Sequence, residues 1–152
     1  NSLFTALVAS VQRQGGQLSL VLLDIDFFKR INDEYGHSTG DQCLSAFAER
    51  MRNVFRRDSD ALLRLGGEEF GVLMMDTPLE QAREMAEEFR HNLASQGLEI
   101  HGQALPMTAS IGVGCYDIQR DSSAETFFKR VDDALYMAKA EGRDRLVLAS
   151  LD

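Results

Sequence analysis

The chain has 152 residues, of which 44% are hydrophobic and 26% are charged, and its formal net charge is −8. This size and composition are typical of one globular domain and exclude a disordered chain. The negative charge argues against a surface for nucleic acid or anionic lipid, because both are attracted to basic patches, but it leaves room for one small phosphate ligand.

The spacing of apolar residues predicts helices and strands along the whole chain. In chain order they are a helix over residues 2–13, a buried strand over 18–25, a helix over 40–56, hairpin strands over 61–65 and 69–75, a helix over 79–93, strands over 98–101 and 105–115, a helix over 127–138 and a strand over 146–148. Gly15-Gly16 ends the first helix, and Gly142 follows the last one as a C-cap. Helices and hairpins around one sheet imply an α/β sandwich with a largely antiparallel sheet.

No apolar stretch approaches the roughly 20 residues that a membrane-spanning helix needs, and no signal-peptide pattern is present. Because the first residue is Asn1 rather than Met, we expect a single domain, residues 1–152, cut from a longer protein with a sensor or regulatory domain missing upstream. Cys43 and Cys115 are isolated in apolar contexts, which favours free thiols in a reducing cytoplasm. No spacing of cysteine and histidine suggests zinc.

Two acidic clusters are candidates for a metal site. Asp24 and Asp26 end the strand predicted over residues 18–25, and Glu68-Glu69 directly follow the glycine pair of the hairpin. Carboxylates gathered at strand ends can hold Mg²⁺, which takes oxygen ligands and keeps positions for water and substrate phosphate. Taken alone, each cluster is more often just a polar strand end or a solvated hairpin tip.

Three segments are candidates for contact with phosphate groups. Gly66-Gly67 is typical of a tight turn, and it also lets a nucleotide approach the backbone closely. Residues 26–29 can form an anion-binding turn with Lys29 as a point charge, unless the two phenylalanines there simply enter the core. Lys139 and Arg143 lie four residues apart near a helix end, where they can reach phosphates or interact with the helix dipole.

Asn32 and Asp41 are candidates for the recognition of guanine. A guanine edge offers N1–H and N2–H₂ as donors and O6 as an acceptor, so a carboxylate can accept the two donors and an amide can supplement them. His37 lies between the two residues in the sequence and is a further candidate for substrate contact, although a lone histidine is more often structural.

Seven strings that contain these residues together resemble the GGDEF family of diguanylate cyclases. They run in order over nearly the whole chain, and the Glu68 variant of the signature, GGEEF, resembles the active form. The strings are Leu23-Asp24-Ile25-Asp26-Phe27-Phe28-Lys29, Ile31-Asn32-Asp33, Tyr35-Gly36-His37, Gly40-Asp41, Arg64-Leu65-Gly66-Gly67-Glu68-Glu69-Phe70, Ser110-Ile111-Gly112-Val113, and Ala134-Leu135-Tyr136-Met137-Ala138-Lys139 with Gly142-Arg143.

The resemblance implies an adenylyl-cyclase-like palm fold and an enzyme that joins two GTP molecules into cyclic di-GMP, releasing two pyrophosphates. It implies that Asp24, the Ile25 carbonyl and Glu68 hold Mg²⁺ or Mn²⁺, and that Glu69 supports the same acidic catalytic site. The other substrate contacts that it implies are Phe27, Phe28, Lys29, Lys139 and Arg143 for phosphates, Asn32 and Asp41 for guanine, Leu44 against the base, and Gly66, Gly67 and His37 nearby.

One domain binds one GTP, so the resemblance implies a homodimer in which two domains face each other in an antiparallel pair. It also implies inhibition by cyclic di-GMP at Arg57 and Asp60 of an Arg-x-x-Asp segment, completed by Arg83 or Arg90 of the next helix. Two features depart from the family pattern. The usual Asp-x-Leu-Thr opening lies outside this chain, and Asp144 replaces the usual Asn after Gly-Arg.

Two other functions are compatible with parts of the pattern. A non-enzymatic receptor for GTP or cyclic di-GMP on the same fold usually has a broken signature or lacks the metal-binding aspartate, and both are intact here. A polymerase-like or nucleotide cyclase enzyme shares the palm, but the candidate guanine-binding residues and the hairpin string disfavour it. We therefore expect a cytoplasmic diguanylate cyclase domain with no nucleic-acid partner and no membrane contact of its own.

Overall fold

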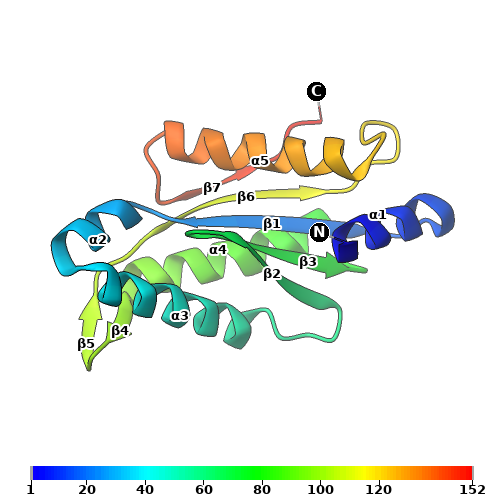
Figure 1. Cartoon of the computed structure of the whole chain (residues 1–152). Coiled ribbons are helices and arrows are strands. Elements are labelled where there is room, and N and C mark those ends of the chain that lie inside the picture. Colours follow the sequence, from blue (N-terminus) through cyan, green and yellow to red (C-terminus); the bar gives the residue numbers. More distant parts are fainter. Residues whose placement is uncertain (1, 152) are drawn as a thin grey trace.

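A computed structural model describes residues 2–151 of the chain (Figure 1). Its helices are α1 (Ser2–Gln14), α2 (Phe28–Tyr35), α3 (His37–Val54), α4 (Leu79–Gln96) and α5 (Ala124–Ala140). Its strands are β1 (Leu18–Ile25), β2 (Asp60–Gly66), β3 (Glu69–Met75), β4 (Leu98–Ile100), β5 (Gln103–Leu105), β6 (Ala109–Cys115) and β7 (Arg145–Leu148).

Five of these strands form one sheet in the order β2-β3-β1-β6-β7, with β1 at its centre. The pairs β2·β3, β3·β1 and β1·β6 are antiparallel, and β7 lies parallel to β6. The prediction of helices around a largely antiparallel sheet is therefore confirmed. The remaining strands, β4 and β5, form a separate hairpin.

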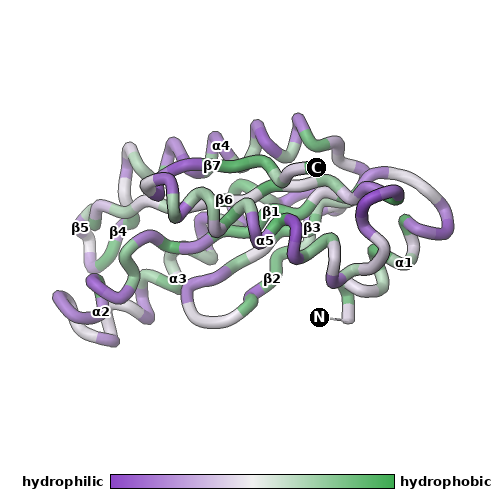
Figure 2. Tube along the Cα trace, turned by 90° about the horizontal axis from the view of Figure 1, so that it is seen from above, coloured by the Kyte–Doolittle hydropathy of each residue, from purple (hydrophilic) through white to green (hydrophobic). Residues whose placement is uncertain are grey.

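β1 is buried on both faces, so its alternating side chains divide the core in two. The side chains that join the core beneath α3 and α4 are Val21, Leu23 and Ile25, and those that join the core beneath α1 and α5 are Leu18, Leu20 and Leu22. Figure 1 shows α5 on one side of the sheet and α3 and α4 on the other, and the tube in Figure 2 is mostly hydrophobic along the central strands. By the same alternation, Asp24 lies on the α5 side of the sheet.

Two boundaries near the end of β1 differ from the sequence prediction. The segment predicted as an anion-binding turn begins a helix, α2, because Phe27 adopts a left-handed conformation with φ 58° and turns the chain out of the strand. Gly36, with φ 92°, separates α2 from α3, which therefore begins at His37 rather than at residue 40. A short polar helix of this kind has too few apolar positions for periodicity to reveal it.

The strand predicted over residues 105–115 is interrupted. Its first residue belongs to β5, which pairs with β4, and the central strand β6 begins only at Ala109. Pro106 lies in the gap and has no backbone N–H to give to a ladder, so the break falls where a continuous strand is least favourable.

The two cysteines are free, as predicted, with Cys43 buried and Cys115 half-buried. Burial raises the pKa of the Cys43 thiol, which disfavours its reactive thiolate form. Among residues 2–151, none of the helices has both the length and the apolar character needed to cross a bilayer.

Candidate active site

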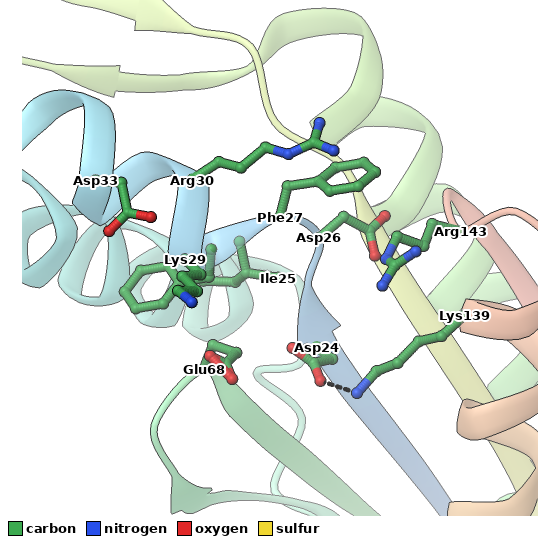
Figure 3. A pocket seen from close by; sticks show the side chains of 11 residues that line it. Asp24, Ile25, Asp26, Phe27, Lys29, Arg30, Asp33, Glu68, Lys139 and Arg143 are labelled. Carbon is green, nitrogen blue, oxygen red and sulfur yellow. Dashed lines mark ion pairs between the residues drawn. The ribbon is translucent and has the colours of Figure 1, made fainter.

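A cavity of about 440 Å³ opens beyond the C-terminal end of β1, where the β2–β3 hairpin, the start of α2 and the end of α5 meet (Figure 3). Acidic and basic side chains line it together, which suits a ligand that brings both a metal ion and phosphates. The lining residues are Asp24, Ile25, Asp26, Phe27, Phe28, Lys29, Arg30, Asp33, Glu68, Lys139 and Arg143.

The two central strands place the carboxylates of Asp24 and Glu68 at this cavity. Asp24 is in register with Glu69 of β3 on one side and with Ser110 of β6 on the other. The backbone N–H of Ile25 donates to the carbonyl of Glu68 at 3.3 Å, which ties the hairpin tip to the end of β1. The antiparallel pairing therefore brings together the two acidic clusters that lie more than 40 residues apart in the sequence.

Side-chain packing and a hydrogen bond stabilise the hairpin tip that carries Glu68. Phe70 is buried with its ring centroid 5.1 Å from that of Phe47, and Arg64 donates to the carbonyl of Gly67 at 2.8 Å. Gly66 and Gly67 have φ values of 127° and 52°, a backbone region that glycine enters without steric cost. The turn itself thus requires the glycine pair. Neither glycine lines the cavity, so a contact with nucleotide stays a prediction.

Asp24 has an electrostatic environment that favours a bound cation. Its side chain is 7% exposed, and burial raises the pKa of the carboxyl to about 6, with the charges of Glu68 and Glu69 adding to the rise. The ion pair and hydrogen bond with Lys139 oppose this shift without cancelling it. A metal ion placed between these carboxylates would relieve their repulsion and stabilise the ionised form of Asp24.

The donor set fits a metal ion that is shared with a substrate rather than enclosed by the protein. In residues 2–151 there is no group of three or more His, Cys, Asp or Glu side chains that could hold a metal ion alone. Asp24 and Glu68 offer two carboxylates, and Ile25, whose carbonyl is the third predicted ligand, lines the cavity beside them. Mg²⁺ is typically bound through one or two carboxylates and completes its shell with water and substrate phosphates.

The predicted phosphate contacts gather around the same cavity. Phe27 and Phe28 form the entry to α2, whose first N–H groups lack partners within the helix and are donors suited to an anion. Lys29, Lys139 and Arg143 line the cavity as well, although they come from opposite ends of the chain. The structure therefore brings together all five residues predicted to contact phosphates.

Arg30 is a basic residue of the cavity that the sequence patterns did not single out. Its guanidinium carbon lies 4.3 Å from the ring centroid of Phe27, and that of Arg143 lies 4.9 Å from the same centroid. The half-exposed ring thus contacts two cations through its π system, an arrangement that holds both arginines beside the cavity. The sequence offered one sign of this contact, which is the spacing of three residues between Phe27 and Arg30. That spacing brings two side chains together only in a helix, and the start of α2 was not predicted here.

The predicted guanine-binding residues lie next to the cavity but not in its lining. A Cβ atom on Gly40 would lie 1.7 Å from Oδ1 of Asn32 and 3.4 Å from Cζ of Phe28, so both side chains pack directly against this glycine. Asp41 follows Gly40 in α3 and is exposed. Asn32 therefore lies against the residue that precedes Asp41, and Phe28, which packs on the same glycine, also lines the cavity.

Two other residues predicted to contact the substrate lie outside the lining of the cavity. His37 is exposed at the first position of α3, and Leu44 is half-buried against the core beneath α3 and α4. Neither lines the cavity that contains Asp24, so their roles stay predictions.

The Arg-x-x-Asp segment lies outside this cavity, just before β2. Nε and NH2 of Arg57 donate to the carboxylate of Asp60, and NH2 also donates to Oγ1 of Thr77 at 2.9 Å. The side chain of Asp60 is 0% exposed, whereas that of Arg57 is 32% exposed. In this arrangement the buried Asp60 orients Arg57, so a direct contact between Asp60 and cyclic di-GMP stays a prediction.

The two candidate partners on α4 are engaged differently. Arg83 forms an exposed ion pair with Glu80 of its own helix. Arg90 pairs with Glu87 and also with Asp144, which follows α5. Arg57 contacts Thr77 at the start of α4, and Arg83 lies two helical turns nearer to that end than Arg90, so Arg83 is the better placed of the two.

Comparison with known proteins gives a consistent result. Residues 1–145 match the family model described as "Diguanylate cyclase, GGDEF domain". The chain is 43% identical over 142 residues to the diguanylate cyclase DgcP of Pseudomonas aeruginosa, a match that covers 93% of this chain and 21% of DgcP. The chain thus spans about a fifth of the length of that relative.

Two solved structures are similar over almost the whole chain. The active GGEEF domain of a diguanylate cyclase from Vibrio cholerae superposes with a TM-score of 0.90 at 32% identity, covering 99% of this chain and 94% of that one. The GGDEF domain of DgcB from Caulobacter crescentus, solved in complex with c-di-GMP, superposes with a TM-score of 0.88 at 29% identity, covering 97% and 86%.

Proposed function

The chain belongs to the family of diguanylate cyclase GGDEF domains, and from that premise we propose that it condenses two molecules of GTP into cyclic di-GMP. The observation that carries the proposal is the convergence of Asp24 and Glu68 with Lys139, Arg143 and the start of α2 on one cavity. Two carboxylates opposite several cations suit a nucleoside triphosphate with its metal ion.

Asp24, the carbonyl of Ile25 and Glu68 are the residues that would hold Mg²⁺ or Mn²⁺ in this proposal. Such an ion neutralises phosphate charge and lowers the pKa of a hydroxyl that it contacts. Ionised Asp24 is needed for this binding, and Lys139 favours the ionised form. Glu69, in register with Asp24, adds a further negative charge to the same acidic site.

Phosphates of GTP would lie against the basic part of the cavity. Lys29 and Lys139 provide point charges, and Arg143 provides a planar fork that can bind two phosphate oxygens at once. The N–H groups at the start of α2 would donate to the terminal phosphates. The N–H groups are held by the helix start and Arg143 by the ring of Phe27, so these donors need little reorganisation when the substrate enters, whereas Lys139 would turn from Asp24 toward a phosphate.

Guanine would be read outside the cavity by Asn32 and Asp41. The carboxylate of Asp41 accepts from N1–H and N2–H₂ of guanine, and the amide of Asn32 supplements these bonds. Gly40 supports this arrangement, because any larger residue there would displace Asn32. In this proposal Leu44, one turn further along α3, would pack on the base, and His37 at the first position of the same helix would contribute a further contact.

The reaction requires two such domains. The 3′-oxygen of one GTP attacks the α-phosphorus of the other and forms a new ester bond. The bond from that phosphorus to the bridging oxygen breaks, pyrophosphate leaves, and the hydroxyl proton is released. Repeating the step in the opposite direction closes the ring. One domain holds one GTP, so an antiparallel homodimer would align the two reactants, and this alignment provides much of the rate enhancement.

A receptor that binds GTP or cyclic di-GMP without turnover is the alternative. The experiment that separates the two incubates the chain with GTP and Mg²⁺ and follows cyclic di-GMP by chromatography and pyrophosphate by a coupled assay. An enzyme yields two pyrophosphates for each cyclic di-GMP, and ATP serves as the control substrate. Binding of GTP without either product would favour the receptor.

A further inference from the structure

The carboxylate of Asp26 lies at the edge of the cavity, yet its oxygens are engaged by the protein. Asp26 is 5% exposed. Oδ1 accepts from the hydroxyl of Ser110 at 2.6 Å, and Oδ2 accepts from the hydroxyl of Thr108 at 2.7 Å and from the backbone N–H of Asp144 at 2.9 Å. Three neutral donors from β6, its preceding loop and the chain after α5 therefore converge on one buried charge.

This pattern separates Asp26 from Asp24, although the two carboxylates are neighbours on the same side of β1. A buried carboxylate is costly unless hydrogen bonds replace its hydration, and Asp26 has three of them. Asp24 has an ion pair with Lys139 and a raised pKa, which suit exchange of the lysine for a metal ion. The hydrogen bonds of Asp26 instead suit a permanent structural link.

The segment that Asp26 holds has an unfavourable backbone. Gly142, Arg143 and Asp144 have φ values of 126°, 64° and 46°, so three consecutive residues lie in the left-handed region. For the two residues with a Cβ atom, this conformation persists only where surrounding contacts enforce it. The N–H of Arg143 donates to the carbonyl of Ala138 at 2.9 Å, and the N–H of Asp144 donates to Asp26.

The same segment presents Arg143 to the cavity. Its guanidinium stacks on Phe27 and lines the cavity together with Lys139 of the preceding helical turn, and Figure 3 shows Arg143 beside Asp26. Without the Asp26 carboxylate, the N–H of Asp144 would lose its acceptor, and the turn would keep only the bond from Arg143 N–H to Ala138 and the contacts of Asp144 with Arg90. Arg143 would then be directed at the cavity less firmly.

We propose that Asp26 is a positioning residue, which holds the Gly142–Asp144 turn so that Arg143 meets the phosphates of bound GTP, and that it is not a metal ligand. The inference rests on the proposed function, because it concerns where GTP phosphates bind. In this proposal Asp26 and Arg143 act together on GTP binding, so a double-mutant cycle should measure a coupling free energy between them.

The first measurement is independent of GTP. Amide hydrogen exchange, read by NMR, should show the Asp144 N–H protected in the wild type and exchanging at least about tenfold faster in Asp26→Ala, because its hydrogen-bond acceptor is gone. Asp133→Ala, a change of an exposed aspartate on α5, should leave that rate unchanged. Equal protection of Asp144 in wild type and Asp26→Ala would overturn the link itself.

The second measurement is calorimetry with 3′-deoxy-GTP and Mg²⁺, since this nucleotide lacks the attacking hydroxyl. Arg143→Ala should weaken binding about tenfold, the scale of one charged hydrogen bond. Asp26→Ala should weaken it several-fold in the wild-type background and less than about twofold in the Arg143→Ala background. Losses that multiply in the double variant would overturn the proposal.

Further controls separate the possible failures. The Mg²⁺ concentration that half-saturates nucleotide binding should shift in Asp24→Ala but not in Asp26→Ala, and a shift in both would make Asp26 a ligand. If Asp26→Ala fails to fold, Asp26→Asn takes its place in the double-mutant cycle. This variant keeps one acceptor oxygen, so its effects on nucleotide binding should be smaller and of the same sign. If the wild type binds no 3′-deoxy-GTP, the proposed function fails, whereas the exchange measurement still decides whether Asp26 holds the turn.

Discussion

Lys139 of α5 forms an ion pair with Asp24 at the end of β1, so a cation from the protein already neutralises the carboxylate that is proposed to bind metal. The pair is asymmetric in exposure, with side-chain exposures of 34% for the lysine and 7% for the aspartate. Lys139 can therefore turn toward a phosphate, whereas Asp24 cannot leave its place in the central strand. Exchange of Lys139 for a metal ion would keep Asp24 neutralised throughout binding.

The raised pKa of Asp24 predicts how the stability of the metal-free chain depends on pH. Burial is the main cause of the rise from 3.8 to about 6. Between these values the folded state holds a proton that the unfolded state has lost, so the contribution of this group to stability is present below pH 3.8 and is lost as pH rises through about 6.

The corresponding variant is Asp24→Asn, which cannot ionise. In EDTA, the urea midpoint of this variant relative to wild type should be higher at pH 7.5 than at pH 5, because only the wild type carries a growing buried charge over that interval. Other titrating groups cancel in the comparison. A difference between the two proteins that is the same at both pH values would contradict a raised pKa.

Replacement of Glu68 tests the acidic site. Glu68→Gln keeps the size of the side chain and removes its charge, so we predict loss of cyclic di-GMP synthesis by about 100-fold or more, the scale of removing one electrostatic contact from an active site. Because Glu68 is half-buried at a hairpin tip, unfolding free energy should change by less than about 1 kcal/mol. Product is measured by chromatography and stability by urea unfolding. Near-normal turnover would remove Glu68 as a required ligand or base.

We expect the selection of guanine over adenine to depend on Asn32 and Asp41. Adenine cannot present the donor edge of guanine, so GTP should be preferred over ATP by a few kcal/mol, and Asp41→Ala should reduce that preference. Gly40→Ala is a sharper test, because the new Cβ would collide with Oδ1 of Asn32 without changing any polar group. We expect it to raise KM for GTP with little change in the metal dependence. Equal use of ATP and GTP by the wild type would contradict the assignment.

Much of this site could be predicted because its residues lie at the ends of regular secondary-structure elements. The unbroken apolar run of β1 defines where Asp24 lies, and the glycine pair of the hairpin defines where Glu68 lies. Antiparallel pairing of neighbouring strands then brings both carboxylates together. The two strand ends could be located from local periodicity and turn chemistry, whereas the roles of Asp24 and Glu68 followed from the resemblance to the GGDEF family.

The remaining features depend on contacts that no local pattern encodes. The hydrogen bond from the Asp144 N–H to Asp26 spans 118 positions, and the stacking of Arg30 on Phe27 requires the left-handed turn that begins α2. The buried ion pair of Asp60 with Arg57 likewise includes a distant contact, because Arg57 also donates to Thr77, which follows β3. An Arg-x-x-Asp string alone does not indicate which of its two side chains reaches solvent.

Inhibition by the product is expected through Arg57 rather than through Asp60. Arg57 is partly exposed, and its NH1, which donates to neither Asp60 nor Thr77, can donate to a phosphate or to O6 or N7 of guanine. Asp60, buried and bonded to Arg57, would act by fixing the direction of the guanidinium. Bound cyclic di-GMP that also engages Arg83 of a neighbouring domain would favour an arrangement in which two active sites cannot meet, so product binding and catalysis become coupled.

Calorimetry with cyclic di-GMP on three variants tests this assignment. Arg57→Ala should weaken binding by about 2 kcal/mol, the scale of a hydrogen bond to a charged group. Asp60→Ala should weaken it less, because the arginine remains but is no longer oriented. Arg56→Ala, an exposed neighbour that makes the same change in net charge, should bind like the wild type. Equal affinity in the Arg57 variant and the wild type would contradict the site. Tight binding by the wild type without slower turnover would leave the site in place and remove its inhibitory role.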